Sequence, residues 1–397
     1  MTEEAAARDA YDVVIIGGAL TGGSTAYHLL AREPSLAVAV IEKDPAYEFA
    51  ASALSFAGVR VLFSQEENIA MSLYGHEFYG DFARLMTVEG EAPVLDFRRQ
   101  GYLFIATEAE AAHDIEANFE LQQRLGCDVV LLDDAGLGAR YPSLRTSDAI
   151  LAVLSPGDGW IDNHAALMGF RAKARALGAD YRAAEVVGLE AAGGRIQQVV
   201  LADGEELRAR TVVNCTGAWA PEICAMAGIE IPVVPLSRMN FYFECRDALE
   251  PMPLTRDIPG IGFRPEGRGY IAGFTDFAAA GRFDFSLRHE VFEAHIWPCL
   301  AHRVPAFEAV KVQTAWAGHY AYNYFDGNLI IGSWPGGPEN FLIATGFSGH
   351  GLQHAPAVGR ALSELILDGE FRSIDLNRFT CRRIVEDEPY PERGMRA

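Results

Sequence analysis

The fold is decided by one stretch near the N-terminus, Tyr11-Asp12-Val13-Val14-Ile15-Ile16-Gly17-Gly18-Ala19-Leu20-Thr21-Gly22-Gly23. Residues 11–16 form a short run rich in β-branched side chains, which predicts a strand buried on both faces. A glycine-rich turn follows, and then a helical stretch over residues 24–32. A second apolar strand, residues 37–41, ends in Glu42. Strand, glycine turn, helix, strand and terminal acid together are typical of a βαβ unit that binds a dinucleotide.

Each part of this unit has a physical role. Gly17 permits the tight turn out of the strand, and Gly22 lets the helix approach the sheet closely. The N-terminus of the helix offers unpaired N–H groups and a positive dipole end to a pyrophosphate. Glu42 follows Gly22 by twenty residues and can accept hydrogen bonds from both hydroxyls of an adenosine ribose. An acid at this position repels a 2′-phosphate, which argues against NADP.

One position departs from the usual glycine pattern. Ala19 replaces the second glycine, and its Cβ would crowd a pyrophosphate. Alanine is the least harmful replacement, and Gly18 beside it keeps the loop flexible. A glycine motif alone is weak evidence, but a complete βαβ context is strong, so we expect a dinucleotide site here.

Composition limits the other possibilities. A chain of 397 residues exceeds what one hydrophobic core usually supports, so we expect two lobes. The hydrophobic share of 50% excludes a disordered or fibrous chain. Lysine and arginine number 33 against 54 acidic residues, and the net charge of −21 with no long basic run argues against nucleic-acid binding.

Cysteine usage and segment hydropathy indicate a cytoplasmic protein. The six cysteines are scattered, with no CxxC pair and no metal-like spacing, so we expect reduced thiols and no metal site. The acidic N-terminus lacks the basic region of a signal peptide, and we expect no membrane span. Residues 381–397 form a polar tail, and the part after Arg383 is expected to be loose.

Three further segments follow in order. Residues 50–58 are rich in small side chains, residues 211–220 read as a strand entering a glycine turn, and residues 341–345 read as a strand that enters the glycine-rich loop 346–351 and a helix over 352–367. With these motifs, the sequence resembles the D-amino-acid-oxidase-like superfamily of FAD-dependent oxidoreductases from residue 11 to about residue 378. The resemblance is to the branch containing sarcosine oxidase, dimethylglycine dehydrogenase and glycine oxidase. Residues 316–323 and 344–356 are most similar to a subgroup of flavoproteins that assist assembly of respiratory complex I, in which catalysis cannot be assumed.

This resemblance implies a mixed α/β fold of the p-hydroxybenzoate-hydroxylase type. A Rossmann-type FAD-binding domain would comprise residues 10–85, 155–232 and 325–380. A substrate domain built mainly on an antiparallel sheet would comprise residues 86–154 and 233–324. The cofactor would be FAD.

The resemblance also implies which positions contact FAD. They are Gly17, Ala19, Leu20, Thr21, Gly22, Glu42, Lys43, Ser52, Ala53, Ala57, Gly58, Val186, Thr216, Gly217, Trp219, Gly318, Gly346, Ser348, Gly349, His350, Gly351, Leu352 and Gln353. The glycine loop that opens the C-terminal helix can direct N–H groups and a helix dipole at the flavin pyrimidine ring. Reduction places negative charge there, so this geometry would stabilise reduced flavin.

Enzymes of this branch oxidise a C–N bond by hydride transfer to flavin N5, and water then hydrolyses the imine. The substrate would be an amino acid or a secondary amine whose carboxylate binds a bidentate arginine. Arg60 and Arg264 are the candidates for that arginine. The other candidate catalytic residues are Tyr242, Tyr270, His319, Tyr320 and His350.

Several positions depart from sarcosine oxidase. Gln353 replaces a carboxylate-binding lysine, and the oxygen-activating lysine has an apolar counterpart near Ile271. The covalent flavin cysteine has no equivalent in residues 318–320, and Ala53 and Leu54 replace a pair of histidines. We therefore expect non-covalent FAD, poor oxygen reactivity and a dehydrogenase whose electron acceptor and oligomeric state the sequence does not define.

Three alternatives stay open at this point. The first is an oxidase of the sarcosine type that passes electrons to oxygen and releases peroxide. The second is an assembly factor that binds FAD without turnover. The third is a 2-hydroxy-acid dehydrogenase, which requires a general base near the hydroxyl, with His319 and His350 as the available histidines.

Overall fold

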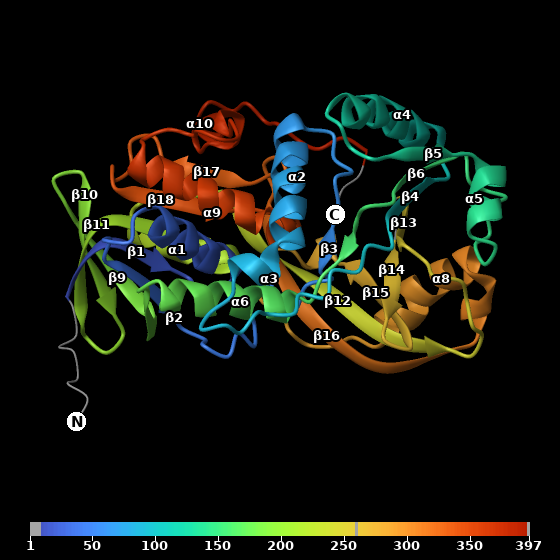
Figure 1. Ribbon diagram of the computed structural model, residues 1–397, viewed down its shortest axis with the longest axis horizontal. Coiled ribbons are helices and arrows are strands. Elements are labelled where there is room, and N and C mark those ends of the chain that lie inside the picture. The colour runs from blue at the N-terminus through green and yellow to red at the C-terminus, as the bar shows by residue number, and fades with distance from the viewer. Residues whose placement is uncertain (1–8, 259–260, 395–397) are drawn as a thin grey trace.

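The computed structural model describes residues 9–258 and 261–394. Two large sheets lie beside each other along the long axis of the molecule, with helices packed on both (Figure 1). The sequence predictions for residues 1–8 and 395–397 lie outside the described residues. Within those ranges, no helix has the length and apolar character needed to span a bilayer.

The first sheet has the strand order β17-β18-β11-β1-β2-β8, and a hairpin of β9 and β10 extends it through β11. Strands β1, β2, β8, β11 and β18 run parallel, with Val14 of β1 between Val212 and Ala39. The bounds are β1 Ala10–Ile16, β2 Val38–Glu42, β8 Asp180–Ala183, β9 Val186–Ala192, β10 Arg195–Leu201, β11 Glu206–Asn214, β17 Ile330–Ser333 and β18 Phe341–Thr345.

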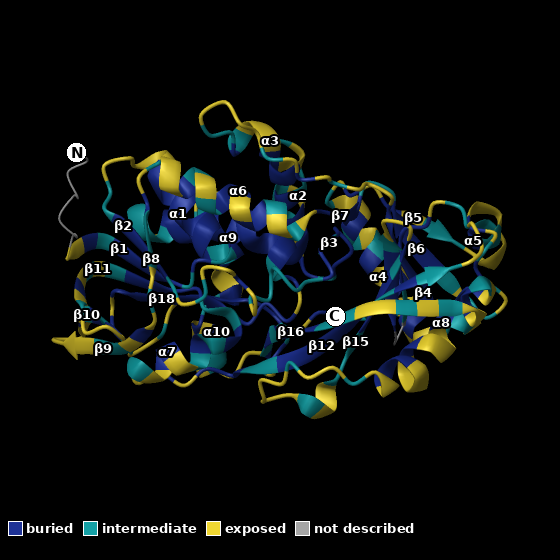
Figure 2. Ribbon diagram, turned by 90° about the horizontal axis from the view of Figure 1, so that it is seen from below, coloured by how far each residue is buried: buried dark blue, intermediate teal, exposed yellow. Residues whose placement is uncertain are grey.

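Both faces of this sheet are covered, which explains the unbroken apolar run of β1. Val13 and Ile15 pack in the core beneath helices α1 (Leu20–Arg32), α6 (Asn163–Ala176) and α9 (Gly351–Leu367). Val14 and Ile16 pack on the opposite side, with β9, β10 and α7 (Ala220–Met226). All four side chains are almost fully buried (Figure 2), and each stabilises the fold by roughly 1.5–3 kcal/mol.

The second sheet has the order β16-β12-β15-β14-β13-β4-β6-β5, and every neighbouring pair is antiparallel except β13 with β4. The bounds are β4 Tyr102–Ala106, β5 Val130–Leu132, β6 Leu151–Ser155, β12 Val233–Cys245, β13 Leu254–Ile258, β14 Gly262–Glu266, β15 Gly269–Thr275 and β16 Val310–Asn323. One face packs on α5 (Asp134–Arg140) and α8 (Trp297–Arg303), and the other on α4 (Ala109–Arg124). The predicted mixed α/β fold with a mainly antiparallel second sheet is confirmed.

The remaining elements connect the two sheets. Helix α2 (Glu66–Gly80) packs on α9, and the short α3 (Phe82–Leu85) follows it. Strands β3 (Gly58–Val59) and β7 (Gly159–Trp160) form a separate pair. Each large sheet draws its strands from separate parts of the chain, but the predicted domain boundaries themselves stay a prediction.

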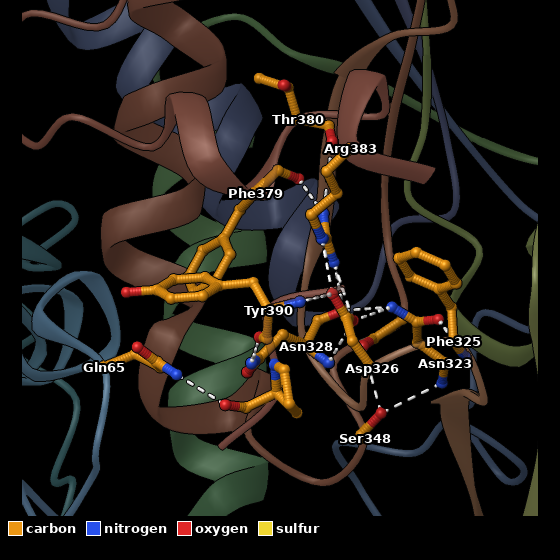
Figure 3. A network of polar contacts seen from close by, with 12 residues as sticks. Gln65, Asn323, Phe325, Asp326, Asn328, Ser348, Phe379, Thr380, Arg383 and Tyr390 are labelled. Carbon is orange, nitrogen blue, oxygen red and sulfur yellow. Dashed lines mark hydrogen bonds and ion pairs between the residues drawn. The ribbon is translucent and has the colours of Figure 1, made fainter. Parts of the chain in front are cut away.

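The C-terminal tail is bound to the body of the protein, so the expectation of a loose tail after Arg383 is wrong for residues 384–394. Arg383, in α10 (Arg382–Val385), forms a buried ion pair with Asp326 at 2.7 Å (Figure 3). The Tyr390 amide donates to the same carboxylate at 3.1 Å, and Glu392 accepts from the Ser64 hydroxyl at 2.6 Å. Asp326 is a buried charge, and Arg383 and the Tyr390 amide compensate its loss of hydration.

Replacing Arg383 with methionine is expected to destabilise the fold by about 3–5 kcal/mol, because the Asp326 charge stays buried without its partner. The free energy of unfolding from urea titration measures this. The adjacent Arg382 pairs with Glu386 at the surface, so Arg382→Met should change stability little. Equal losses in the two variants would contradict the structural role of the Asp326–Arg383 pair.

Candidate active site

A cavity of about 740 Å³ lies between the two sheets, and we call it the inter-sheet cavity. Its lining runs from Glu42, at the end of β2, to Tyr102 and Arg256 on the second sheet. Its size is in the range of cofactor and ligand sites. Both sheets therefore contribute to a single chamber.

The β1–α1 turn forms one wall of the inter-sheet cavity. Gly17 has φ +92°, and a Cβ on it would lie 2.7 Å from the carbonyl oxygen of Cys215. A Cβ on Gly22 would lie only 1.9 Å from the Gly17 oxygen, so glycine is required for helix and turn to approach this closely. Ala19 is the N-cap of α1, and its side chain has no atom that can accept a hydrogen bond. The N–H groups in the first turn of α1 are therefore not capped by this residue.

Glu42 has its carboxylate fixed at the end of β2. One oxygen accepts from the Gly18 amide at 2.8 Å, and the other accepts from the Asp44 amide at 2.8 Å. Burial raises the pKa of Glu42, while these two hydrogen bonds act in the opposite direction. Each oxygen retains acceptor capacity for a diol at the cavity wall.

A second helix N-terminus reaches the inter-sheet cavity from the C-terminal half. The loop before α9 has positive φ at Gly346, Ser348 and Gly349, and the N-cap His350 provides no side-chain cap. The Ser348 hydroxyl accepts from the Asn323 amide at 3.1 Å, which joins this loop to the network around Asp326 (Figure 3). The loop is thus fixed from behind, with its backbone along the cavity.

The chamber fits FAD, because two helix N-termini without side-chain caps and an anchored carboxylate line the same cavity. Eighteen of the sequence-predicted cofactor positions line it, and these residues would hold FAD. They are Gly17, Ala19, Leu20, Thr21, Glu42, Lys43, Ser52, Ala57, Gly58, Val186, Thr216, Gly217, Trp219, Gly349, His350, Gly351, Leu352 and Gln353.

The other five predicted cofactor positions lie outside the lining. Gly22 and Gly346 shape the backbone of the two loops, and Ser348 binds Asn323. Gly318 packs against Leu54, where a Cβ would approach the Leu54 Cβ to 2.8 Å. Ala53 packs against the core, and its carbonyl accepts from Asn163 at 2.7 Å.

Arg60 lies at the other end of the inter-sheet cavity and is buried. Its guanidinium lies 3.9 Å from the centre of the Phe63 ring and donates to the Leu62 carbonyl. One terminal nitrogen lies 3.4 Å from Nε2 of His350, and the Arg60 amide donates to Gln353 at 2.8 Å. Burial lowers the pKa of Arg60.

His350 is a neutral imidazole in this setting. Burial lowers the pKa of His350 well below its ordinary value, and the positive charge of Arg60 adds to the shift. With Nε2 facing an Arg60 donor, the proton belongs on Nδ1.

Two sequence candidates are engaged elsewhere, which corrects their prediction as cavity residues. Arg264 donates to the Phe56 carbonyl at 2.9 Å and pairs with Glu266, so two of its three nitrogens are already engaged. The Tyr242 hydroxyl donates to Glu244 at 3.3 Å, away from the cavity lining.

Tyr270 and His319 also lie outside the lining. Tyr270 packs against Phe307 with ring centres 4.8 Å apart, as part of the core on the far face of the second sheet. His319 packs against Phe285 with ring centres 4.4 Å apart, and its Nε2 accepts a hydrogen bond from the Asp284 amide at 3.0 Å. Tyr320, by contrast, does line the cavity, and its hydroxyl accepts from Arg238.

Aromatic side chains from the segment after β15 pack against aromatic side chains on the opposite side of the cavity. Phe283, in the segment after β15, stacks on Trp219 with ring centres 4.5 Å apart and an angle of 15°. Phe285 packs edge-on against Phe49 at 4.7 Å. All four rings line the cavity, so this segment closes part of its surface.

Sequence reasoning missed Arg238, Arg256 and Tyr102, which line the cavity from strands of the second sheet. Their strands contain no glycine motif. Only the pairing of β12, β13 and β4 brings them to one face, and that pairing joins residues far apart in the chain.

The fold and the chamber define a Rossmann-type dinucleotide-binding oxidoreductase, and comparisons with known proteins make this specific. The profile of the family "FAD dependent oxidoreductase" matches residues 12–365. The chain belongs to this family, and its cofactor is FAD.

Relatives of known sequence and structure agree with this assignment. FAD-dependent oxidoreductase domain-containing protein 1 of Xenopus laevis is 37% identical over 97% of this chain and 84% of its own length. Human mitochondrial dimethylglycine dehydrogenase is 26% identical over 94% of this chain but only 45% of its own length. The crystal structure of L-proline dehydrogenase from P. horikoshii has a TM-score of 0.86 at 27% identity and covers 97% of this chain and 100% of its own.

Replacing Gly22 with alanine is expected to reduce the FAD content of the purified protein severely. The new Cβ cannot lie 1.9 Å from the Gly17 oxygen, so α1 must move away from the turn. The FAD-to-protein absorbance ratio measures this, with circular dichroism to show that the chain is folded. Gly157→Ala is the control, because no heavy atom lies within 4 Å of a Cβ there; full FAD content in Gly22→Ala would contradict the packing argument.

Acid is expected to destabilise the protein through His354. Burial lowers the pKa of His354 to about 3, so it is neutral when folded, whereas the unfolded chain takes up a proton below about pH 6.5. Stability contributed by this residue therefore falls as the pH drops from about 6.5, by about 3 kcal/mol at pH 4. Urea titrations across this pH range should show a shallower slope in His354→Gln than in the parent protein. Parallel slopes in the parent and the variant would exclude His354 as the titrating group.

Proposed function

We propose that the protein oxidises the C–N bond of an amino acid or an N-substituted amino acid. The observation that carries this proposal is the Arg256 guanidinium, which lines the inter-sheet cavity and has no hydrogen-bond or ion-pair partner within the described residues. A guanidinium in such a place is suited to bind a substrate carboxylate in a bidentate manner. Bound FAD supplies the acceptor for the two electrons and the hydrogen of the C–H bond.

The charges at this end of the cavity favour the reactive form of an amine. Arg60 and Arg256 carry positive charge, and His350 is neutral. Positive charges nearby disfavour a substrate ammonium, so the bound amine loses its proton more readily than in water. The nitrogen lone pair is then available to form the C=N bond as the C–H bond breaks, and water hydrolyses the imine.

We propose a dehydrogenase rather than an oxidase. The position near Ile271, where sarcosine oxidase has its oxygen-activating lysine, is apolar and buried among hydrophobic side chains. The similarity to L-proline dehydrogenase supports the same reading. A 2-hydroxy-acid substrate is disfavoured, because the neutral His350 faces an arginine and His319 lies outside the lining.

The test is anaerobic mixing of the purified protein with N-methyl amino acids, proline, opines and hydroxy acids. Loss of the oxidised flavin absorbance with an amine, slow reoxidation by air and little peroxide are the expected results. Rapid peroxide formation would establish an oxidase instead. An FAD-loaded protein that no compound bleaches would contradict the proposal and favour the role of a non-catalytic assembly factor.

Replacing Arg256 with methionine is expected to raise the substrate concentration for half-maximal bleaching about tenfold or more, because a charge-assisted bidentate pair is lost. FAD content should stay unchanged. The control is Arg268→Met, whose side chain is 89% exposed and pairs with Glu244 at the surface. If the substrate concentration for half-maximal bleaching were unchanged in Arg256→Met, Arg256 would not bind the substrate carboxylate.

A further inference from the structure

Two adjacent glycines leave a gap between side chains on the face of the second sheet that borders the inter-sheet cavity. Gly273 of β15 pairs with Gly262 of β14, so the two positions are direct neighbours. On the outer sides, Gly273 pairs with Asn240 and Gly262 pairs with Arg256. These four residues form one row across four strands, and the middle two have no side chain.

Two arginines lie over this gap. A Cβ on Gly273 would lie 2.6 Å from a terminal nitrogen of Arg238 and 2.8 Å from its Nε. A Cβ on Gly262 would lie 3.0 Å from Cγ of Arg256 and 3.5 Å from its Nε. Neighbouring strands are about 4.8 Å apart, so the two side chains approach each other from opposite sides. We call Arg238 and Arg256 the arginine pair.

The arginine pair lacks negative partners in the protein. Arg238 is only 6% exposed and donates to the Tyr320 hydroxyl and to the Asn240 amide oxygen at 3.3 Å. Across residues 9–258 and 261–394, neither member forms an ion pair with a carboxylate. Arg256 is partly exposed, and a second cation beside the buried Arg238 is costly unless a ligand supplies compensating charge.

The acidic residues of the cavity cannot provide that charge. They follow or belong to elements of the first sheet and its helices, at the Glu42 end of the chamber: Glu42, Asp44, Glu185 and Glu222. Arg60 adds a third positive charge to the cavity lining, and its guanidinium contacts His350 and the Phe63 ring. The substrate end of the cavity is therefore positive throughout.

We propose that the substrate carries two carboxylates, one for each member of the arginine pair. The proposal rests on the proposed function and narrows its substrate to secondary amines with an acidic group on each side of the nitrogen, that is, N-(carboxyalkyl) amino acids. A single carboxylate would satisfy one guanidinium and leave the other without a counter-charge.

Binding without turnover tests the arginine pair directly. Malonate and succinate are titrated against acetate and propionate into the FAD-loaded protein at constant ionic strength, and the change in the flavin spectrum gives each Kd. Dicarboxylates are expected to bind about tenfold or more tightly than monocarboxylates of similar size. Equal affinities would overturn the proposal.

Variants separate the two arginines. Arg238→Met should abolish the preference for dicarboxylates while monocarboxylates bind as before. Gly273→Ala keeps every charge but displaces Arg238, so it should also lower the preference. Arg268→Met should keep it. A preference that survives both Arg238→Met and Gly273→Ala would overturn the assignment to the pair.

Turnover distinguishes failure of this inference from failure of the proposed function. Iminodiacetate is expected to bleach the flavin at a lower concentration than sarcosine, which lacks the second carboxylate. If sarcosine is as effective and malonate binds no better than acetate, oxidation stands and the dicarboxylate inference fails. If malonate binds through both arginines but no amine bleaches the flavin, the anion site stands and the proposed oxidation fails.

Discussion

The contact of Gly22 with the carbonyl of Gly17 is the constraint on which the rest of the structure depends. It sets the distance of α1 from β1, and α9 then packs on α1 so closely that a Cβ on Gly359 would lie 2.2 Å from the Ser24 hydroxyl. The next layer repeats this, because a Cβ on Gly75 of α2 would lie 2.4 Å from the Gln353 carbonyl. Glycine at each contact holds α1 and α9 with their N-termini at one cavity.

Sequence reasoning named eighteen residues that line the chamber, because local patterns encode the turns and loops that carry them. The run of β1, the glycine turn and Glu42 lie within some thirty residues, and strand β18 was predicted with its observed bounds. The tail was misjudged, since its polar residues have buried partners such as Asp326 that only the folded chain brings near.

The wall of the chamber that the second sheet forms was harder to predict, for a physical reason. Arg264 and Arg256 lie in the same face of the second sheet, and local sequence does not separate them. The two arginines differ in their neighbouring residues. Glu266 forms an ion pair with Arg264, whereas Gly262, which has no side chain, lies beside Arg256. Such assignments depend on strand register, which joins distant segments and leaves no periodic signal.

The network behind the cofactor loop has a consequence for the order of biosynthesis. Ser348 is held by Asn323, which bonds to Asp326, and Asp326 is neutralised by Arg383. The loop therefore depends on residues that emerge from the ribosome after it. The wall of the chamber that this loop builds therefore gains these supporting contacts only once the tail has been synthesised.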